Sequence, residues 1–372
     1  MSRSKNKVRY AVVGLGHIAQ VAVLPAFQAA RNSELFALVS GDPEKLRKLG
    51  KKYNLAHLYP YQEYSRALSN VDAVFLTLPN HLHREYSVRA AAAGVHVLCE
   101  KPMAPTTQEC REMIEAANRN HVKLMVAYRP HFETGNLEAI KLAQEGKLGD
   151  VRAFTSEFAQ QVADNNVRVK EPVPRGGGPL YDLGVYCINA ARYLFRSEPL
   201  EVCALGASKD EPRFERVEEM VSAVLRFPGE RLATFTCSFG AADGSRYKLI
   251  GSKGILQADP AYQYAEGTRL EVTINGKRKT RSFPKRDQFA AELTYFSNCI
   301  LQDKQPEPSG LEGLADVHII EAIYHSIRTR RTVAIPQRIE KKKGPDESQE
   351  VHRPAHGKPE VFHAHSASRE AA

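Results

Sequence analysis

The sequence contains no tryptophan, only six cysteines, and no apolar run of the roughly 18 residues that a membrane-spanning helix needs. None of the cysteines belongs to a C-x-x-C pair, so the sequence indicates neither a metal site nor a disulfide framework. The polar residues 1–7 lead directly into a strand-like run, without the apolar stretch of a secretory signal. We therefore expect a cytoplasmic protein with reduced thiols and no contact with a membrane.

Positive charge is in modest excess. Lysine and arginine outnumber aspartate and glutamate by 52 to 43, which gives a net charge of +9. A basic balance can accompany nucleic-acid binding, but the sequence has neither zinc-finger spacing nor the interleaved aromatic and basic residues of an RNA-recognition motif. We therefore expect no nucleic-acid partner. The charge fits a solvated surface or the binding of a phosphorylated cofactor.

The length of 372 residues predicts two domains with a tail, and the first 130 residues alternate between strand and helix patterns. Short, almost continuously apolar runs are typical of strands that are buried on both faces of a parallel sheet. The predicted strands are Val8–Val13, Leu35–Val39, Ala73–Leu78, Val95–Cys99 and Lys123–Ala127. The predicted helices are Ile18–Ala30, Pro43–Tyr53, His83–Ala93 and Thr106–Asn120. This order predicts an α/β domain over residues 1–130, a Rossmann fold with a doubly wound parallel sheet that binds a dinucleotide.

Residues 131–336 differ in texture, because strand patterns and glycine-containing turns dominate. We predict an α+β domain with an open, mostly antiparallel sheet that binds substrate and forms the oligomer interface. Its predicted strands are Val151–Val162, Val202–Ala207, Met220–Phe227, Arg231–Phe239, Tyr247–Gly251 and Leu270–Ile274, and its predicted helices are Pro179–Leu194, Asp287–Gln302 and Leu311–Thr329. From about Gln337 the chain has almost no apolar residues, which predicts a disordered tail over 337–372 without a function.

A glycine pattern connects the first predicted strand to the first predicted helix. Gly14, Gly16 and Ala19 match G-x-G-x-x-[G/A], the turn that binds the pyrophosphate of a dinucleotide. Gly14 permits the tight turn, Gly16 lets the backbone approach the phosphates, and Ala19 allows the helix to pack closely on the sheet. The backbone N–H groups at the helix start, from Gly16 through His17 and Ile18, would face the phosphates.

The end of the second predicted strand distinguishes the two nicotinamide cofactors. A carboxylate about 20 residues beyond the glycines normally binds the ribose hydroxyls of NAD. Ser40 stands at this position, Asp42 is expected to cap the next helix, and Lys45 follows in its first turn. A hydroxyl and a cation can bind the 2′-phosphate that a carboxylate would repel, so the sequence favours NADP over NAD.

Three further motifs carry a family resemblance. They are Leu78-Pro79-Asn80-His81-Leu82-His83, Cys99-Glu100-Lys101-Pro102, and the segment from Gly176 to Asn189. With the segment from Tyr128 to Glu133, they resemble the Gfo/Idh/MocA oxidoreductase family over about residues 7–335. Many members have D-x-G-x-H-x-x-D in the third motif, whereas Tyr186 replaces the histidine and Asn189 the second aspartate here. This variant is similar to glucose-fructose oxidoreductase and related NADP-dependent aldose dehydrogenases.

The resemblance implies a catalytic set of Lys101, Asp182 and Tyr186. Tyrosine has an ordinary pKa of about 10, so Tyr186 acts as a base near neutrality only beside a cation, which Lys101 would supply. Asp182 would bind the sugar or steady Lys101; alternatively, Asp182 caps a helix and Tyr186 only packs. Pro102 would aim Lys101 through a cis bond. The implied cofactor contacts are Tyr61, Pro79, Asn80, His83, Glu100, Lys101 and Arg129.

These observations predict an oxidoreductase that transfers a hydride between NADP(H) and a pyranose sugar or related polyol. Two alternatives stay open: a catalytically silent NADP-binding regulator, and a redox-assisted lyase or glycosidase that recycles its nucleotide. An open sheet with one uncovered face usually packs against a partner surface, and the family pairs through this sheet. We therefore expect a homodimer or a homotetramer.

Overall fold

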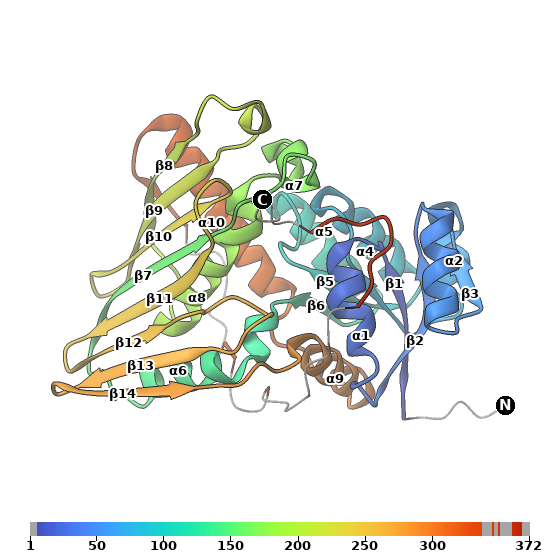
Figure 1. Cartoon of the computed structure of the whole chain (residues 1–372), viewed down its shortest axis with the longest axis horizontal. Coiled ribbons are helices and arrows are strands. Elements are labelled where there is room, and N and C mark those ends of the chain that lie inside the picture. Colours follow the sequence, from blue (N-terminus) through green and yellow to red (C-terminus); the bar gives the residue numbers. More distant parts are fainter. Residues whose placement is uncertain (1–5, 337–343, 346–348, 350–358, 367–372) are drawn as a thin grey trace.

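The computed structural model describes residues 6–336, 344–345, 349 and 359–366. Its first sheet lies in the N-terminal part of the chain. Six parallel strands follow the order β3-β2-β1-β4-β5-β6, at the right of Figure 1. The strands are β1 (Val8–Val13), β2 (Ser33–Val39), β3 (His57–Tyr59), β4 (Ala73–Leu76), β5 (His96–Glu100) and β6 (Leu124–Ala127). The strand order reverses between β1 and β4, and ligands bind beyond the carboxyl ends of the strands at such a point.

Helices connect these strands, and side-chain caps begin two of them, one of which, Asp42, the sequence predicts. Asp42 accepts hydrogen bonds from the first turn of α2, and Thr106 accepts one from the Glu109 N–H of α5 at 3.2 Å. The helices are α1 (Leu24–Ala26), α2 (Pro43–Lys52), α3 (Tyr64–Leu68), α4 (His83–Ala92) and α5 (Thr107–Arg119). The first predicted helix, Ile18–Ala30, was too long, because α1 ends at Ala26. A π-helical turn, η1 (Ala19–Val23), precedes α1, and Pro25 within α1 cannot donate a backbone hydrogen bond.

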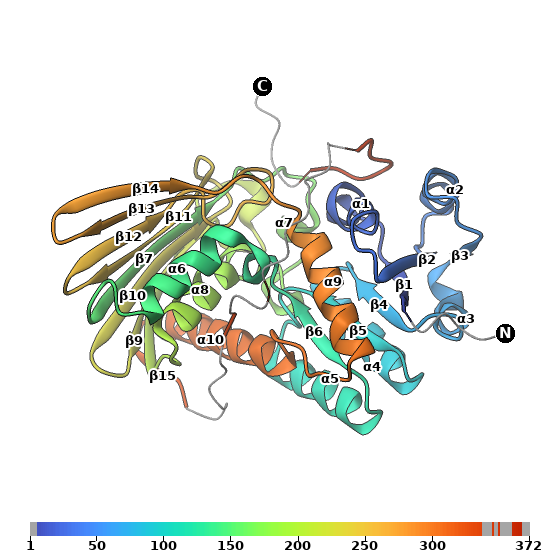
Figure 2. The same ribbon diagram turned by 90° about the horizontal axis from the view of Figure 1, so that it is seen from below.

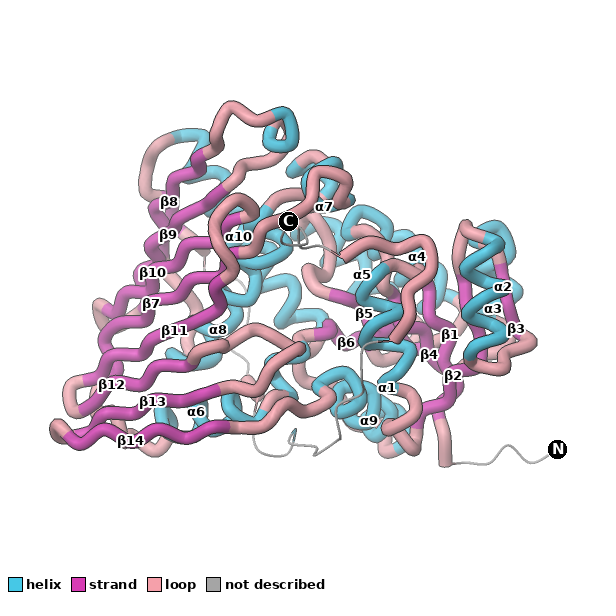
Figure 3. Tube along the Cα trace, viewed as in Figure 1, coloured by secondary structure: helices cyan, strands magenta, loops and turns pink. Residues whose placement is uncertain are grey.

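The second sheet has nine strands in the order β14-β13-β12-β11-β7-β10-β9-β8-β15, and they run side by side at one end of the molecule (Figure 3). All its pairs are antiparallel except β7 with β10. The strands are β7 (Val151–Ala159), β8 (Glu201–Ala207), β9 (Met220–Phe227), β10 (Arg231–Ser238), β11 (Gly244–Gly251), β12 (Gly254–Ala258), β13 (Arg269–Ile274), β14 (Lys277–Ser282) and β15 (Val333–Ala334). The predicted fold class, a parallel sheet followed by an open and mostly antiparallel one, is confirmed.

Helices cover one face of the second sheet and separate it from the first. The helices are α6 (Thr134–Gln144), α7 (Val167–Lys170), α8 (Val185–Phe195), α9 (Gln288–Leu301) and α10 (Gly310–Thr329). Figure 2 shows α6, α8 and α10 on the inner face, where one apolar cluster joins Val126 of β6 to Leu225 of β9. No helix of the described part lies on the outer face, where Leu205, Val224 and Leu232 are exposed.

The last two long helices, α9 and α10, pack across the domain boundary that the sequence predicts near residue 130. Phe289 and Phe296 of α9 belong to the same apolar cluster as Tyr10 of β1. The Tyr10 hydroxyl also lies 2.8 Å from the Ser297 hydroxyl, so α9 covers a face of the first sheet. A chain boundary near residue 130 therefore does not separate all the packing, and the domain limits stay predictions.

Several elements have no prediction because they carry little apolar periodicity. All six residues of β14 are exposed and most are basic, and β3, β12, β15, α3, α6 and α7 also lack predictions. Within the described part of the chain, no helix has the length and apolar composition to cross a membrane.

Part of the predicted disordered tail is placed against the first sheet. Residues 359–366 pack beside η1 and α2. Phe362 packs against the apolar cluster that contains Tyr10 of β1 and Phe289 of α9. Two hydrogen bonds between the Gln20 side chain and the Phe362 backbone hold this segment, and the disordered tail over 337–372 stays a prediction. The remaining residues of 337–372, apart from 344–345 and 349, lie outside the described residues.

Candidate active site

The glycine turn after β1 fits a bound pyrophosphate. Gly14 has a φ of +91°, and a Cβ there would lie 2.8 Å from the Thr77 carbonyl oxygen, so only glycine fits. A Cβ at Gly16 would meet no atom within 4 Å, so this stretch of backbone borders open space. His17 and Ile18 are partly exposed beside it. The turn therefore combines a tight bend with room for a phosphate to approach the backbone.

The loop after β2 is ordered by its own side chains. Ser40 is buried, and its hydroxyl accepts a hydrogen bond from the Asp42 N–H at 3.2 Å. Asp42 in turn accepts from the N–H groups of Glu44 and Lys45 at 2.9 and 3.0 Å. The hydrogen bond from the Lys45 backbone is the main reason that the pKa of Asp42 lies below its ordinary value. Tyr61 packs against this loop from the neighbouring turn, so Ser40, Lys45 and Tyr61 lie in one region.

The segment after β4 contacts the second domain. Pro79 precedes a short helical turn, and Asn80 Nδ2 donates to the Gly176 carbonyl oxygen at 2.7 Å. Gly176 has a φ of +83°, and a Cβ there would lie 2.7 Å from the Asn80 Cβ. The contact therefore needs glycine at 176, and it holds Asn80 between the two domains.

His83 differs from the cofactor contact that the resemblance implies. It is fully buried, and its Nδ1 and Nε2 lie 3.0 and 2.9 Å from the carbonyl oxygens of Pro102 and Leu78. Burial lowers its pKa. His83 thus holds the backbone that follows Lys101, whose peptide bond to Pro102 is cis, and its contact with a cofactor stays a prediction.

Lys101 and Asp182 form a buried pair at the carboxyl end of β5. Lys101 Nζ donates to the Asp182 carbonyl oxygen at 2.8 Å and to Asp182 Oδ1 at 3.0 Å. Arg168 Nε, on α7, lies 2.9 Å from the same Oδ1. Burial alone would raise the pKa of Asp182, but the charges of Arg168 and Lys101 outweigh it, so that the pKa lies below its ordinary value. Asp182 is therefore a carboxylate held between two cations.

Tyr186 lies one turn beyond Asp182, at the start of α8. Lys101 Nζ lies 4.5 Å from the centroid of its ring, and the Arg129 guanidinium carbon lies 5.0 Å away. The residue is 6% exposed, and its hydroxyl makes no hydrogen bond to any described residue. The structure thus brings Lys101, Asp182 and Tyr186 together, with the lysine over the ring face rather than at the hydroxyl.

Arg129 links the site to helix α9. Its Nη1 donates to Gln288 Oε1 at 3.0 Å, and its Nη2 donates to the Tyr262 carbonyl oxygen. Its guanidinium carbon lies 5.3 Å from the centroid of the Tyr264 ring. Glu100 lies next to Lys101 and is partly buried, and burial outweighs the nearby positive charges to raise its pKa. Arg129 and Glu100 therefore lie beside Tyr186 and Lys101, with Arg129 held by protein groups, and their contacts with a cofactor stay a prediction.

Two residues of this region were missed by the sequence analysis. Arg168 lies in the 164–175 loop, whose pattern predicts no element and gives no sign of its contact with Asp182. Glu292 is fully buried on α9, and neither of its carboxyl oxygens has a hydrogen-bond partner in the described part of the chain. Burial, with the charge of Glu100 adding to it, raises the pKa of Glu292 well above its ordinary value. No spacing in the sequence signals the contact of Arg168 with Asp182 or the burial of Glu292.

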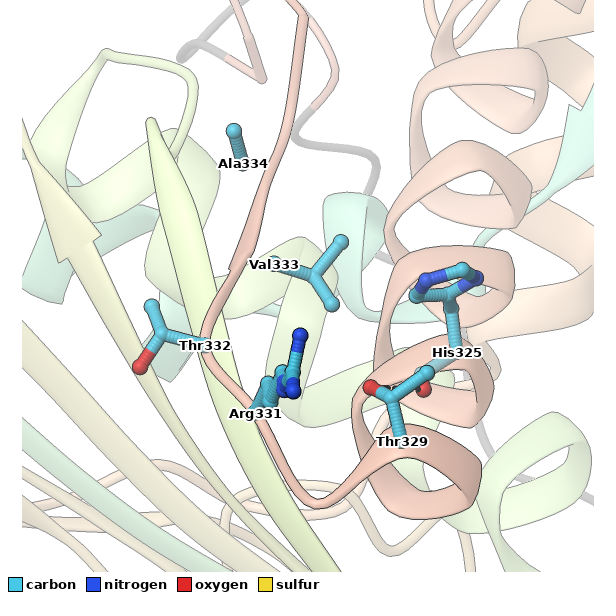
Figure 4. Close-up of a pocket in the computed structure, with 6 residues that line it drawn as sticks. All are labelled: His325, Thr329, Arg331, Thr332, Val333 and Ala334. Atoms are coloured by element: carbon cyan, nitrogen blue, oxygen red, sulfur yellow. Dashed lines mark hydrogen bonds between the residues drawn. The ribbon is translucent and has the colours of Figure 1, made fainter.

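A cavity of about 520 Å³ lies elsewhere, at the end of α10 beside β15 (Figure 4). Its lining residues are His325, Thr329, Arg331, Thr332, Val333 and Ala334. None of the predicted catalytic or cofactor residues lines it, and it lies beyond the second sheet's edge strand rather than at a carboxyl end of the first sheet. This cavity is therefore separate from the candidate site around Lys101.

Comparisons with known proteins identify the family of both domains. Residues 8–128 match the model of an oxidoreductase family with an NAD-binding Rossmann fold, and residues 136–257 match the GFO/IDH/MocA C-terminal domain. The NADP(+)-dependent D-xylose 1-dehydrogenase of Haloarcula marismortui is 30% identical over 89% of this chain and 94% of its own. The dTDP-3,4-didehydro-2,6-dideoxy-alpha-D-glucose 3-reductase of Saccharopolyspora spinosa is 30% identical over 80% of this chain and 88% of its own.

A solved structure extends the likeness to the whole fold. The aldose-aldose oxidoreductase from Caulobacter crescentus, crystallised with glycerol, superposes with a TM-score of 0.84 at 39% identity. The match covers 88% of this chain and 99% of that one. Both domains and the order of their elements are therefore shared with known oxidoreductases. The chain belongs to the GFO/IDH/MocA family of oxidoreductases.

Proposed function

We propose that this chain is an oxidoreductase that transfers a hydride between NADP(H) and a pyranose sugar or a related polyol. Its family is one of oxidoreductases, and two of its relatives are a D-xylose dehydrogenase and an aldose-aldose oxidoreductase. The observation that carries the proposal is the buried cluster of Lys101, Asp182 and Tyr186 at the carboxyl end of β5. Sites of α/β sheets lie at this edge, and these groups can bind a hydroxyl and accept its proton.

The residues of the first domain fit NADP. The open space at Gly16 suits the pyrophosphate, and Ser40 with Lys45 stands where the 2′-phosphate of the adenosine ribose would lie. The relative from Haloarcula marismortui is an NADP(+)-dependent enzyme. When bound, the nicotinamide accepts or supplies the hydride, and the protein provides position and electrostatics.

Lys101 is arranged to bind the reacting hydroxyl. An ammonium group has three N–H donors, and two of them are directed at the Asp182 carbonyl oxygen and at Asp182 Oδ1. The third remains for a substrate oxygen. Because Asp182 is held by Arg168 as well, the lysine is anchored by a carboxylate that is itself fixed. This arrangement would hold the sugar oxygen in one orientation, which is a main source of catalysis.

Tyr186 is the residue to which we assign proton transfer. Its hydroxyl makes no hydrogen bond to any described residue, so it is available to a substrate hydroxyl. Lys101 and Arg129 lie over its ring, and in this proposal the Tyr186 oxygen accepts the hydroxyl proton as the hydride leaves carbon. In the alternative, Lys101 accepts the proton itself and Tyr186 only packs.

The test is a survey of aldoses and polyols with NADP and with NAD. We expect reduced nucleotide to form with at least one pyranose, and faster with NADP. Retained nucleotide would show as one turnover per site, followed by further turnover only when a second aldose is added. An enzyme that binds NADP but oxidises no sugar or polyol contradicts the proposal and favours the silent regulator.

The second sheet supports assembly into a homo-oligomer, and the cysteines support a location in the cytoplasm. The outer face of the second sheet exposes Leu205, Val224 and Leu232, which suits a homodimer or homotetramer that pairs through this face. All six cysteines are unpaired, as the reducing conditions of the cytoplasm would keep them. The oligomeric state is tested below.

A further inference from the structure

The segment 359–366 returns from the far end of the chain to the dinucleotide-binding half. Figure 2 shows it beside α1, and hydrogen bonds connect it to η1 and α2. It lies outside both ranges that match the family models, residues 8–128 and 136–257. The contacts of this segment are therefore a feature of this chain that the family models do not describe.

One buried amide joins the segment to the glycine turn. Gln20 is 1% exposed, and its Nε2 donates to the Leu15 carbonyl oxygen at 2.9 Å and to the Phe362 carbonyl oxygen at 2.8 Å. Its Oε1 accepts from the Phe362 N–H at 2.7 Å. Leu15 lies between the two glycines of the turn. The Gln20 side chain therefore connects the Phe362 backbone directly to the backbone that would bind the phosphates.

The side chain of Phe362 holds the segment on α2. Lys48 Nζ and Lys52 Nζ lie 5.1 and 5.7 Å from the centroid of its ring. Lys52 Nζ also donates to the Glu360 carbonyl oxygen at 3.0 Å. Because the segment belongs to the same chain, these modest contacts act at a high effective concentration.

His363 lies between two carboxylates that follow Ser40. Its Nδ1 lies 3.1 Å from Asp42 Oδ2, and its Nε2 lies 3.1 Å from Glu44 Oε2. A carboxylate oxygen only accepts hydrogen bonds, so the ring pairs with both carboxylates when both of its nitrogens carry a proton. His363 thus stands as the partner of two carboxylates beside the loop of Ser40 and Lys45.

We propose that residues 359–366 form a clasp that completes the adenosine side of the dinucleotide site, with His363 as a determinant of NADP selectivity. The inference rests on the proposed function, since it presupposes NADP binding. Asp42 and Glu44 stand directly after Ser40, where their charges would repel a 2′-phosphate. His363 offsets this repulsion. NAD carries no such phosphate, so its binding depends on the clasp but much less on the charge of His363.

The experiment compares nucleotide binding by the full chain, by His363→Ala and by a chain that ends at residue 358. Because the protein has no tryptophan, the fluorescence of NADPH and NADH can be titrated without an indole background. We expect His363→Ala to weaken NADPH binding about fivefold and NADH binding less than twofold. The shortened chain should weaken both and release NADPH faster. His365→Ala, an exposed histidine two residues further on, is the control and should match the full chain.

Two outcomes overturn the clasp. Tighter NADPH binding by the shortened chain would mean that the segment occupies the site and blocks it, and unchanged affinity in His363→Ala would mean that its charge plays no part. If the shortened chain is less stable, the point variant still decides, because thermal unfolding identifies a misfolded sample. Failure of the proposed function is distinct: the full chain would then bind neither nucleotide, or it would bind NADP and oxidise no sugar or polyol.

Discussion

Lys101 Nζ lies over the face of the Tyr186 ring, 4.5 Å from its centroid, and donates its hydrogen bonds to Asp182 instead. The sequence predicted that the two residues act together, but it did not indicate this geometry. A cation over a ring face interacts with the whole aromatic system, and it leaves the hydroxyl open toward a substrate. Asp182 thus orients the lysine, and the lysine stands over the ring of Tyr186.

Tyr186→Phe should lower kcat by about 10² to 10⁴, because it keeps the packed ring and removes the proton acceptor. The affinity for NADP should change little, and single-turnover kinetics measure the chemical step directly. A phenylalanine variant that keeps most of its kcat would assign the proton to Lys101 alone.

Lys101→Ala should cost a similar factor or more, because it removes both the charge over the ring and the donor to the substrate oxygen. The double variant should lose far less than the product of the two single losses, since residues that act as one unit are not additive. Independent effects, in which the two losses multiply, would show that the residues do not share a role.

Arg168→Gln should lower kcat/KM about tenfold, the typical worth of a hydrogen bond to a charged group. Asp182 would lose one of its two cationic partners, and its pKa would rise toward the ordinary value. The acidic limb of the pH–rate profile should therefore move to higher pH. Arg175→Gln is the matched control, because Arg175 lies in the same loop and pairs with Glu171 instead. Equal effects of the two variants would remove Arg168 from the site.

NADP should bind at least about tenfold more tightly than NAD, a difference of about 1.4 kcal/mol. Ser40→Asp should narrow or reverse that preference, because a third carboxylate next to Asp42 and Glu44 would repel the 2′-phosphate. Calorimetric titration with both nucleotides measures the ratio. Equal affinities in the wild-type protein would contradict the assignment of Ser40.

Asp316 predicts a pH dependence of folding stability. It is fully buried beside Arg192 and Asn189, and burial raises its pKa from 3.8 to about 7, with Glu312 adding to the rise and Arg192 opposing it. Between these values the folded state keeps a proton that the unfolded state releases. This group therefore favours the folded state fully below about pH 4, and its contribution falls as the pH rises, by up to about 1.4 kcal/mol per unit.

The measurement is the free energy of unfolding in urea from pH 4 to pH 7. Relative to Asp316→Asn, the wild-type protein should lose stability as the pH rises through this window. Asp303→Asn is the control, because the hydrogen bond from Lys123 lowers the pKa of that exposed carboxyl, which places its titration below the window. Parallel curves for the wild-type protein and Asp316→Asn would show that Asp316 is charged in the folded state.

The protein should have a mass of at least twice 41.4 kDa by light scattering at micromolar concentration. A glutamate at Leu205, which is 69% exposed on the outer face of the second sheet, should shift the mass toward a monomer, because a charge buried in an apolar interface is costly. Leu301→Glu is the control, since Leu301 is exposed on α9 and away from that face. A wild-type mass near 41.4 kDa would contradict the expected assembly.

Local chemistry explains what could be predicted from the sequence. Almost continuously apolar runs marked the strands of the first sheet except β3, Thr106 and Asp42 marked the starts of two helices, and Gly14 marked the turn after β1. Each of these signals acts within a few residues, because a cap or a turn is satisfied by its own neighbours in the chain. The motif around Lys101 is similarly local, so the catalytic candidates could be named before their positions were known.

Contacts between distant residues were decided by the tertiary structure alone. Arg168 pairs with Asp182, Arg129 donates to Gln288, and His363 bridges Asp42 and Glu44 across more than 300 positions of the chain. No periodicity encodes such pairs, because they exist only when helices and sheets pack and leave charged groups that must find partners. By itself, therefore, the sequence determined the two kinds of sheet, the glycine turn and the identity of the candidate side chains. Packing decided that Lys101 donates to Asp182 and that residues 359–366 return to η1 and α2.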